Sequence, residues 1–532
     1  MAEVVQVFQL QHPLLGCING TDGDVVAFRG IQYATLENRL AEAVIKDSYP
    51  KTIDATKYGP ISPNPPGSFQ LEMKLMQQTQ PDPYYLTSSD TEALNLNIWI
   101  PKGREGQLLQ NLPVYVFIHG GGFISGSGNS PHYDLTRLVK LSAAKGTPIT
   151  GVTVNYRLGL LGLLTSQELR DADFKANNQL RDQRAAFQWL KKYIEGFGGD
   201  PENITASGES TGGVCTGLHL LSQESLFNRA YLTGGSPLLM QVAGLEEHEN
   251  HYQQVIEALG LAAATPEERI FALLGTPYDE LFTRVPMNIA YRPMLDGDVV
   301  PFAMNHGNVQ DKESKIPGRR WLNGLVIGDC QFDASSLAIL AGFKKSNIAK
   351  KFPDIMRARL GDSATTERLL AAYDADASND DETVFTGFLR FSTDIGYYAA
   401  TCSFAQGWAP ITYTFAFNEP NPWLGMFQGH ATHVFDIAML FQNFQTDLPA
   451  AQVEAGRQMA ADLFLFVHGR PPWVTAGKGT MVYGPSVVGP VRNVVSGRLP
   501  EEAGRRRAII DASDAITIDE IAAVHAAFMA SA

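Results

Sequence analysis

The sequence predicts an α/β fold in which a large, mostly parallel central sheet is flanked by helices. Apolar runs rich in Val, Ile and Leu recur along most of the 532 residues, and segments of helical periodicity lie between several of them. Strands that are apolar at nearly every position are typical of a parallel sheet covered on both faces. No internal repeat or low-complexity linker divides the chain, so we expect one domain over residues 1–532 that carries insertions.

The predicted elements alternate along the chain as such a sheet requires. Helical spacing of apolar residues is clearest between Leu180 and Ile194. Two further packing helices are expected over residues 453–469 and 518–530. The strand-like runs cover residues 94–101, 113–119, 149–156, 203–209, 229–236, 323–329 and 411–417.

Composition and charge exclude some classes of binding partner. Hydrophobic residues make up 44% of the chain and charged residues 18%, which is enough apolar material for a large core. The net charge of −14 argues against nucleic acid, which needs clustered Lys and Arg. No apolar run approaches the roughly 18 residues of a membrane span. The composition therefore favours a globular protein and argues against nucleic-acid binding and a membrane span.

The cysteines and the N-terminal residues indicate the cellular compartment. The four cysteines are scattered without CxxC spacing, which predicts neither a disulfide framework nor a zinc site. The N-terminal residues show neither the basic segment nor the apolar block of a signal peptide. We therefore expect a cytoplasmic protein with reduced thiols.

The main chemical motif is G-x-S-x-G over residues 208–212, between a strand-like run and a helix-like run. Small residues at both ends allow a tight, strained turn that projects the serine above the sheet at a helix N-terminus. Ser210 is therefore the candidate nucleophile. Taken alone, a match of this length also fits a surface turn, so further features are needed.

A glycine run supplies the second feature. Gly120, Gly121 and Gly122 follow the predicted strand that ends at His119. Glycines there let backbone N–H groups approach a substrate, as in the oxyanion-hole loop of esterases. The N–H groups of Gly121 and Gly122, together with that of Thr211, would bind a developing oxyanion. We expect His119 to brace the loop.

An acid and a histidine follow in the order Ser, acid, His that the α/β-hydrolase fold requires. Asp329 ends the strand-like run 323–329 and Asp333 follows it, whereas His430 and His433 follow the run 411–417. In such a triad the histidine takes the serine proton and the acid orients and stabilises the ring. The order of the residues leaves two candidates for each role.

The sequence resembles the type-B carboxylesterase/cholinesterase/lipase family over most of its length. Five segments carry the resemblance: residues 28–34 (FRGIQYA), 94–99 (LNLNIW), 154–159 (VNYRLG), 182–183 (DQ) and 197–201 (FGGDP). The resemblance implies an α/β-hydrolase fold and favours His433, which has an acid at +3 and Phe at +8. It also favours Asp333, five residues after a glycine, over Asp329.

The sequence departs from the family pattern at several positions. Gln32 replaces a proline, Thr211 stands where Ala is usual after the nucleophile, and Val434 replaces the glycine after the histidine. Secreted members carry a disulfide cysteine where this chain has Ala93, which supports a cytoplasmic location.

These residues predict a carboxylic ester hydrolase that works through an acyl-enzyme. An acyltransferase would use the same residues, and a non-catalytic binding protein would be expected to have lost Ser210 or His433. The expected partner is a small-molecule ester, and no metal or organic cofactor is implied, because serine catalysis needs neither. The sequence does not indicate the ester or the oligomeric state. Four residues are candidates for an apolar substrate pocket or for core: Phe123, Trp423, Met426 and Phe427.

Overall fold

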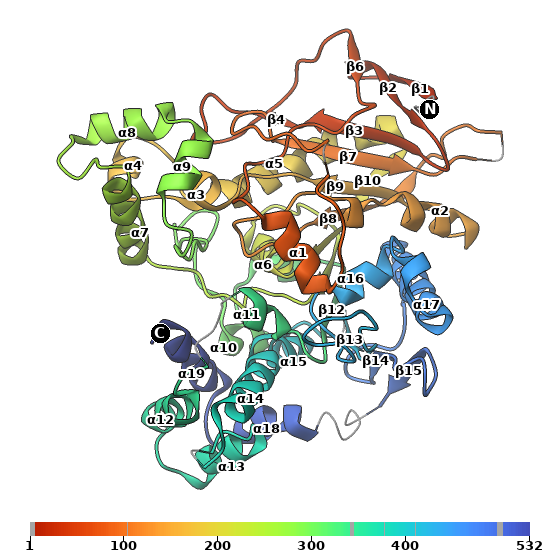
Figure 1. The fold of residues 1–532 in the computed structure, drawn as a ribbon. Coiled ribbons are helices and arrows are strands. Elements are labelled where there is room, and N and C mark those ends of the chain that lie inside the picture. Colours follow the sequence, from red (N-terminus) through yellow and green to blue (C-terminus); the bar gives the residue numbers. More distant parts are fainter. Residues whose placement is uncertain are drawn as a thin grey trace.

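The structure is a computed structural model, and it describes residues 6–83, 85–103, 105–340, 345–376, 378–409, 411–496 and 504–531. Within these ranges one twisted sheet of 13 strands runs through the molecule (Figure 1). Its strand order is β1-β2-β3-β7-β9-β8-β10-β11-β12-β13-β14-β15, and β6 pairs with β2. The predicted α/β fold with a mostly parallel sheet is therefore confirmed.

The centre of the sheet is parallel and its two ends are antiparallel. Strands β9, β8, β10, β11, β12, β13 and β14 pair in parallel, whereas β1, β2, β3 and β7 form an antiparallel edge and β15 pairs antiparallel with β14. The seven predicted strands are β7 to β13. The strands of the sheet are β1 (Val7–His12), β2 (Gly16–Asp22), β3 (Val26–Gln32), β6 (Thr52–Asp54), β7 (Asn95–Ile100), β8 (Leu112–Ile118), β9 (Thr150–Val154), β10 (Gly199–Glu209), β11 (Arg229–Thr233), β12 (Gly324–Cys330), β13 (Thr412–Phe417), β14 (Thr480–Tyr483) and β15 (Arg492–Val495).

Helices lie on both faces of the sheet and in the insertions. The three helices predicted from apolar spacing correspond to α5, α17 and α19. The α-helices are α1 (Ser68–Met76), α2 (Thr136–Ala144), α3 (Gly159–Leu163), α4 (Gln167–Asp171), α5 (Asn178–Tyr193), α6 (Thr211–Leu218), α7 (Leu245–Ala258), α8 (Pro266–Gly275), α9 (Tyr278–Arg284), α10 (His306–Gln310), α11 (Ser335–Leu340), α12 (Ile348–Leu360), α13 (Ala364–Ala372), α14 (Asp381–Thr393), α15 (Ala399–Gly407), α16 (Phe435–Leu440), α17 (Ala450–Val467), α18 (Gly504–Ala512) and α19 (Ile518–Ala530).

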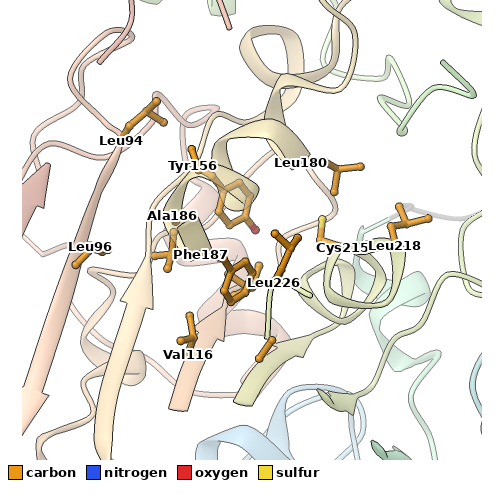
Figure 2. Close-up of a cluster of buried hydrophobic side chains, with 14 of the residues drawn as sticks. Leu94, Leu96, Val116, Tyr156, Leu180, Ala186, Phe187, Cys215, Leu218 and Leu226 are labelled. Carbon is orange, nitrogen blue, oxygen red and sulfur yellow. The ribbon is translucent and has the colours of Figure 1, made fainter. Parts of the chain in front are cut away.

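Central strands such as β8 are mostly apolar because both faces of the sheet are buried there. Successive residues of a strand point to opposite faces. In β8, Val116 joins the core beneath α5 and α6, whereas Tyr115 and Phe117 join a second core with α16 and α17. Figure 2 shows part of the first of these cores, in which Phe187 of α5 lies toward Val116 of β8 and Leu180 lies toward Cys215 of α6.

A third core lies in the helical insertion at the lower end of Figure 1, where α12, α13, α14, α18 and α19 gather. Phe352, Phe388 and Phe528 pack there in mutual aromatic contact, with ring centroids 4.4 to 5.6 Å apart. Phe332, in the loop after β12, also belongs to this core. The insertion is therefore packed against the loop that carries Asp333.

No helix in the described ranges combines the length and the apolar character needed to cross a membrane.

Candidate active site

Ser210 lies at a sharp turn between the end of β10 and the start of α6. Its backbone angles are φ 55° and ψ −127°, a strained combination for a residue with a side chain. A Cβ atom added to Gly208 would lie 2.1 Å from the carbonyl oxygen of Gly212, and one added to Gly212 would lie 2.1 Å from that of Ile118. Both glycines of the motif are therefore required by close backbone contact.

A chain of hydrogen bonds joins Ser210 to the two residues favoured by the resemblance. Nε2 of His433 lies 3.0 Å from Oγ of Ser210, and Nδ1 of His433 lies 2.7 Å from Oδ1 of Asp333. The loop after β12 carries Asp333, and the loop before α16 carries His433. The structure thus brings together the carboxylate, the imidazole and the hydroxyl in the order needed to move a proton from the serine.

Backbone groups hold the acid and the base in place. The N–H of Cys330 donates to Oδ2 of Asp333 at 2.6 Å, which leaves Oδ1 for the imidazole. The N–H of His433 donates to Oγ of Ser335 at 3.1 Å, so the histidine backbone is attached to the acid-bearing segment. The side chains of Asp333 and His433 are buried, which favours a fixed geometry, and Ser210 is half-buried.

The alternative candidates for the acid and the base, Asp329 and His430, lie away from the contacts that join Ser210, His433 and Asp333. Asp329 is buried in an ion pair with Arg506, 2.8 Å from its Nη1, and burial raises the pKa of Asp329 to about 7 even though the guanidinium opposes this. His430 is exposed, and its ring packs 5.2 Å from that of Phe332. Neither contacts Ser210 or His433 in any hydrogen bond of the described residues.

The glycine loop lies directly against the nucleophile. A Cβ atom on Gly120 would come within 2.9 Å of Cβ of Ser210. Gly121, Gly122 and Phe123 have φ values of +107°, +65° and +68°, so three successive residues adopt left-handed conformations. This turn gives the loop the close approach that was expected of an oxyanion-binding segment.

His119 braces the loop, as expected. Its ring stacks on that of Tyr156 with centroids 4.4 Å apart, and Nδ1 lies 2.8 Å from the carbonyl oxygen of Gly120. Burial lowers the pKa of His119 to about 4, so the ring is neutral at physiological pH. A neutral, stacked imidazole in this place supports the turn and leaves proton transfer to His433.

Glu209 is a site residue that the sequence analysis did not identify. Its Oε1 lies 3.2 Å from Nε2 of His433 and makes no hydrogen bond within the described residues. Burial raises the pKa of Glu209. Burial alone would lower the pKa of His433, but the facing Glu209 and Asp333 outweigh it and raise that pKa. An acid in the position before a candidate nucleophile was the signal that could have revealed this contact.

Val434 shows how the chain tolerates its departure from glycine after the histidine. Its φ is +69°, a conformation that a β-branched residue rarely adopts, and its side chain is buried in the core beside α16. Packing therefore holds a strained backbone next to His433.

A narrow apolar pocket begins at Ile124, directly after the glycine loop. The N–H of Ile124 donates to the carbonyl oxygen of Gly121 at 3.2 Å, which ties the pocket wall to the loop. The lining comes from the segment before α1, from Ile124, from α3 and from the segment at and after α9: Pro65, Ile124, Gly159, Leu160, Leu161, Leu281, Phe282, Val285, Pro286, Met287, Ile289 and Tyr291.

The four pocket candidates from the sequence do not line this pocket. Phe123 is buried in the core, and Trp423 packs against Phe435 while its indole N–H donates to the carbonyl oxygen of Asp447. Met426 is 67% exposed, and Phe427 packs on the ring of Phe332. Phe123 and Trp423 therefore have the contacts of core residues, Phe427 is half-buried against another ring, and Met426 lies at the surface.

Three features define a protein of the α/β-hydrolase class: the sharp turn at Ser210, the glycine loop, and the joined Ser, His and Asp side chains at the carboxyl ends of parallel strands. A sequence profile described as the Carboxylesterase family matches residues 5–467. The chain belongs to this family.

Several curated relatives share part of the sequence. Human bile salt-activated lipase is 35% identical over 229 residues, which is 40% of this chain and 30% of the lipase. Para-nitrobenzyl esterase of Bacillus subtilis is 30% identical over 57% of this chain and 60% of the esterase. Fumonisin B1 esterase of Sphingopyxis macrogoltabida is 33% identical over 55% and 51%. The matched regions thus span from under a third to about three fifths of these relatives.

Solved structures share the fold over almost the whole chain. A PNB esterase superposes with a TM-score of 0.71 at 20% identity, covering 94% of this chain and 100% of its own. A carboxylesterase of Geobacillus stearothermophilus superposes with a TM-score of 0.71 at 24% identity, covering 94% and 99%. At these identities the similarity establishes the fold.

Proposed function

We propose that this protein hydrolyses carboxylic esters through an acyl-enzyme, with Ser210 as nucleophile, His433 as general base and Asp333 as the orienting acid. The observation that carries the proposal is the continuous contact from Ser210 through His433 to Asp333, at 3.0 and 2.7 Å. Family membership supports it, as do the relatives named as esterases and lipases.

The first half of the reaction forms the acyl-enzyme. Nε2 of His433 takes the proton of Ser210 as Oγ attacks the ester carbonyl, and Asp333 stabilises the imidazolium that results. The N–H groups of Gly121, Gly122 and Thr211 donate to the carbonyl oxygen as it becomes negative. The imidazolium then gives its proton to the leaving alcohol, and the C–O bond of the ester breaks.

Water completes the cycle by the same route. His433 removes a proton from the water that attacks the acyl-enzyme, and the carboxylic acid leaves as Ser210 regains its proton. Glu209 faces the ring nitrogen that carries the proton in both halves, so its negative charge favours the imidazolium.

The pocket beside the glycine loop supports an ester with an apolar chain as the substrate class. Its walls are almost entirely aliphatic or aromatic, and Tyr291 is the residue with a polar side chain among those that line it. Such a pocket favours an apolar chain on the ester. Ile289→Trp should therefore reduce kcat/KM for long p-nitrophenyl esters more than for the acetate, whereas Leu424→Trp, at an 85% exposed position, should change neither.

We also propose that the chain functions as one domain in the reducing cytoplasm. The scattered cysteines and Ala93, in the place of a disulfide cysteine of secreted relatives, support this location.

Labelling by a fluorophosphonate tests the nucleophile. The reagent should modify a single residue, Ser210, and Ser210→Ala should lower kcat on p-nitrophenyl esters by about 10⁶. Adding acceptor alcohols to the same assay measures any acyl transfer, which uses the same residues. Labelling that persists in Ser210→Ala would overturn the assignment.

A further inference from the structure

The residue after the nucleophile makes an unusual contact. Thr211 is the first residue of α6, and its side chain is buried. Its Oγ1 accepts a hydrogen bond from the backbone N–H of Phe123 at 3.3 Å. Phe123 is the last of the three left-handed residues in the glycine loop. The hydroxyl therefore joins the helix that carries Ser210 to the loop that faces it.

The glycine loop needs external support because its conformation is strained. A left-handed φ is costly for an aromatic residue such as Phe123. Within the loop, the N–H and Oγ of Ser125 both donate to the carbonyl oxygen of Gly121, at 3.0 and 2.9 Å. The N–H of Gly159, at the start of α3, donates to the carbonyl oxygen of Phe123 at 2.8 Å. These bonds hold the loop to itself and to α3.

The proposed oxyanion donors come from two separate elements. Gly121 and Gly122 lie on the loop, whereas the N–H of Thr211 lies on α6. Both sets must reach one oxygen atom at the same time, so a small shift of the loop relative to α6 weakens the stabilisation of the transition state. The bond from Phe123 to Thr211 fixes this relative position directly.

We propose that Thr211 is a positioning residue whose side-chain hydroxyl holds the oxyanion loop in register with the nucleophile. This inference rests on the proposed function of Ser210. The proposal assigns the Thr211 hydroxyl a positioning role that an alanine at this position could not fulfil. The hydroxyl acts through Phe123 and the loop, and the Thr211 backbone N–H remains a separate donor.

Valine is the sharpest replacement because it keeps the branched shape and removes the acceptor. Thr211→Val leaves the Phe123 N–H buried without a partner, so the loop must move to satisfy it. Thr211→Ser restores the acceptor with less bulk. Thr216→Val is a matched control on the same helix: its buried Oγ1 donates to the carbonyl oxygen of Gly212 at 2.9 Å and has no bond to the loop.

The test compares kcat and KM on p-nitrophenyl butyrate with the inhibition constant of an aryl trifluoromethyl ketone, whose adduct with Ser210 resembles the tetrahedral intermediate. Thr211→Val should lower kcat about 10- to 100-fold with KM within about twofold, and weaken the ketone by a similar factor. Thr211→Ser should recover most of both losses. Thr216→Val should retain kcat and ketone affinity.

Two results would overturn the proposal. One is a Thr211→Val enzyme with kcat within about twofold of the parent, and the other is a Thr211→Ser enzyme as impaired as Thr211→Val. If Thr211→Val does not fold, Thr211→Ala against Thr211→Ser gives the same comparison, with fluorescence-detected thermal unfolding as the check on folding. Fluorophosphonate labelling of the parent at Ser210 separates these outcomes from a failure of the proposed nucleophile.

Discussion

Oε1 of Glu209 lies 3.2 Å from Nε2 of His433, the same ring nitrogen that lies 3.0 Å from the hydroxyl of Ser210. The imidazole therefore has a carboxylate at each nitrogen, Glu209 at Nε2 and Asp333 at Nδ1. Two negative groups around one ring favour its protonated form. The arrangement stabilises the imidazolium of the transition state and also sets the pH at which the free base becomes available.

Replacing Glu209 by Gln should move the pH dependence of activity. The reaction needs neutral His433 at the start, and the Glu209 carboxylate raises the pKa of His433. Glu209→Gln removes that charge, so the pKa falls and the acid limb of kcat/KM should move to lower pH by about one unit. The plateau should drop about tenfold, because the imidazolium loses a stabilising charge. A limb that stays in place or moves to higher pH would show that Glu209 does not control the base.

Asp329, within β12, and Asp333, in the loop after β12, should have separable effects. Asp333→Asn should reduce kcat by about 10⁴ with little change in KM, because the amide carries no charge and can select the wrong tautomer of His433. Asp329→Asn should keep most of kcat but destabilise the fold by about 1–3 kcal/mol, because the buried Arg506 loses one of its carboxylate partners. Steady-state kinetics and urea unfolding measure the two effects. A crippling Asp329→Asn with a mild Asp333→Asn would reverse the assignment.

The two histidines before α16 offer a similar comparison. His433→Ala should abolish turnover, since it removes the base that contacts Ser210. His430→Ala should retain most activity, because that ring is exposed and its aromatic contact is with Phe332. Initial rates on a p-nitrophenyl ester decide the matter. Equal losses of activity in both variants would mean that activity depends on the conformation of the loop, and not on the His433 ring alone.

The cysteines should react as four free thiols of unequal accessibility. Titration of the unfolded, unreduced protein should count all four. In the folded protein, burial raises the pKa of Cys402 to about 11 and that of Cys215 to about 12, and Cys330 is fully buried, so these three should react slowly. Cys17 is half-buried and should account for the fast phase. Cys17→Ser should remove that phase, and a mass shift on reduction would contradict free thiols.

The fold could be predicted from the sequence because both faces of the central strands are buried, so β8 is apolar at every position. The turn that carries Ser210 could also be predicted from the sequence. Gly208 and Gly212 are required there, because backbone atoms lie too close to leave room for a side chain. Spacing relative to a known family separated Asp333 from Asp329 where chain order could not. Each of these features depends on local sequence or on its order along the chain.

Other parts of the site depend on contacts between distant segments. The contact of Glu209 with His433 joins residues more than 200 positions apart, and the bond from Phe123 to Thr211 joins a loop and a helix. Trp423 and Phe427 are pocket candidates in the sequence, but in the fold Trp423 is buried against Phe435 and Phe427 is half-buried against Phe332. The apolar pocket instead combines residues from four separate regions of the chain that no periodicity connects.

The separation of the three reacting groups along the chain has a consequence for how activity is acquired. Ser210 and His433 are 223 positions apart, and His433 and Asp333 are 100 apart. Contacts between such distant segments form late, because the loops between them must close first. During refolding, ester hydrolysis should therefore return only after most helical signal has recovered. A chain truncated before the His433 segment would leave the ribosome with its nucleophile in place and no means to activate it.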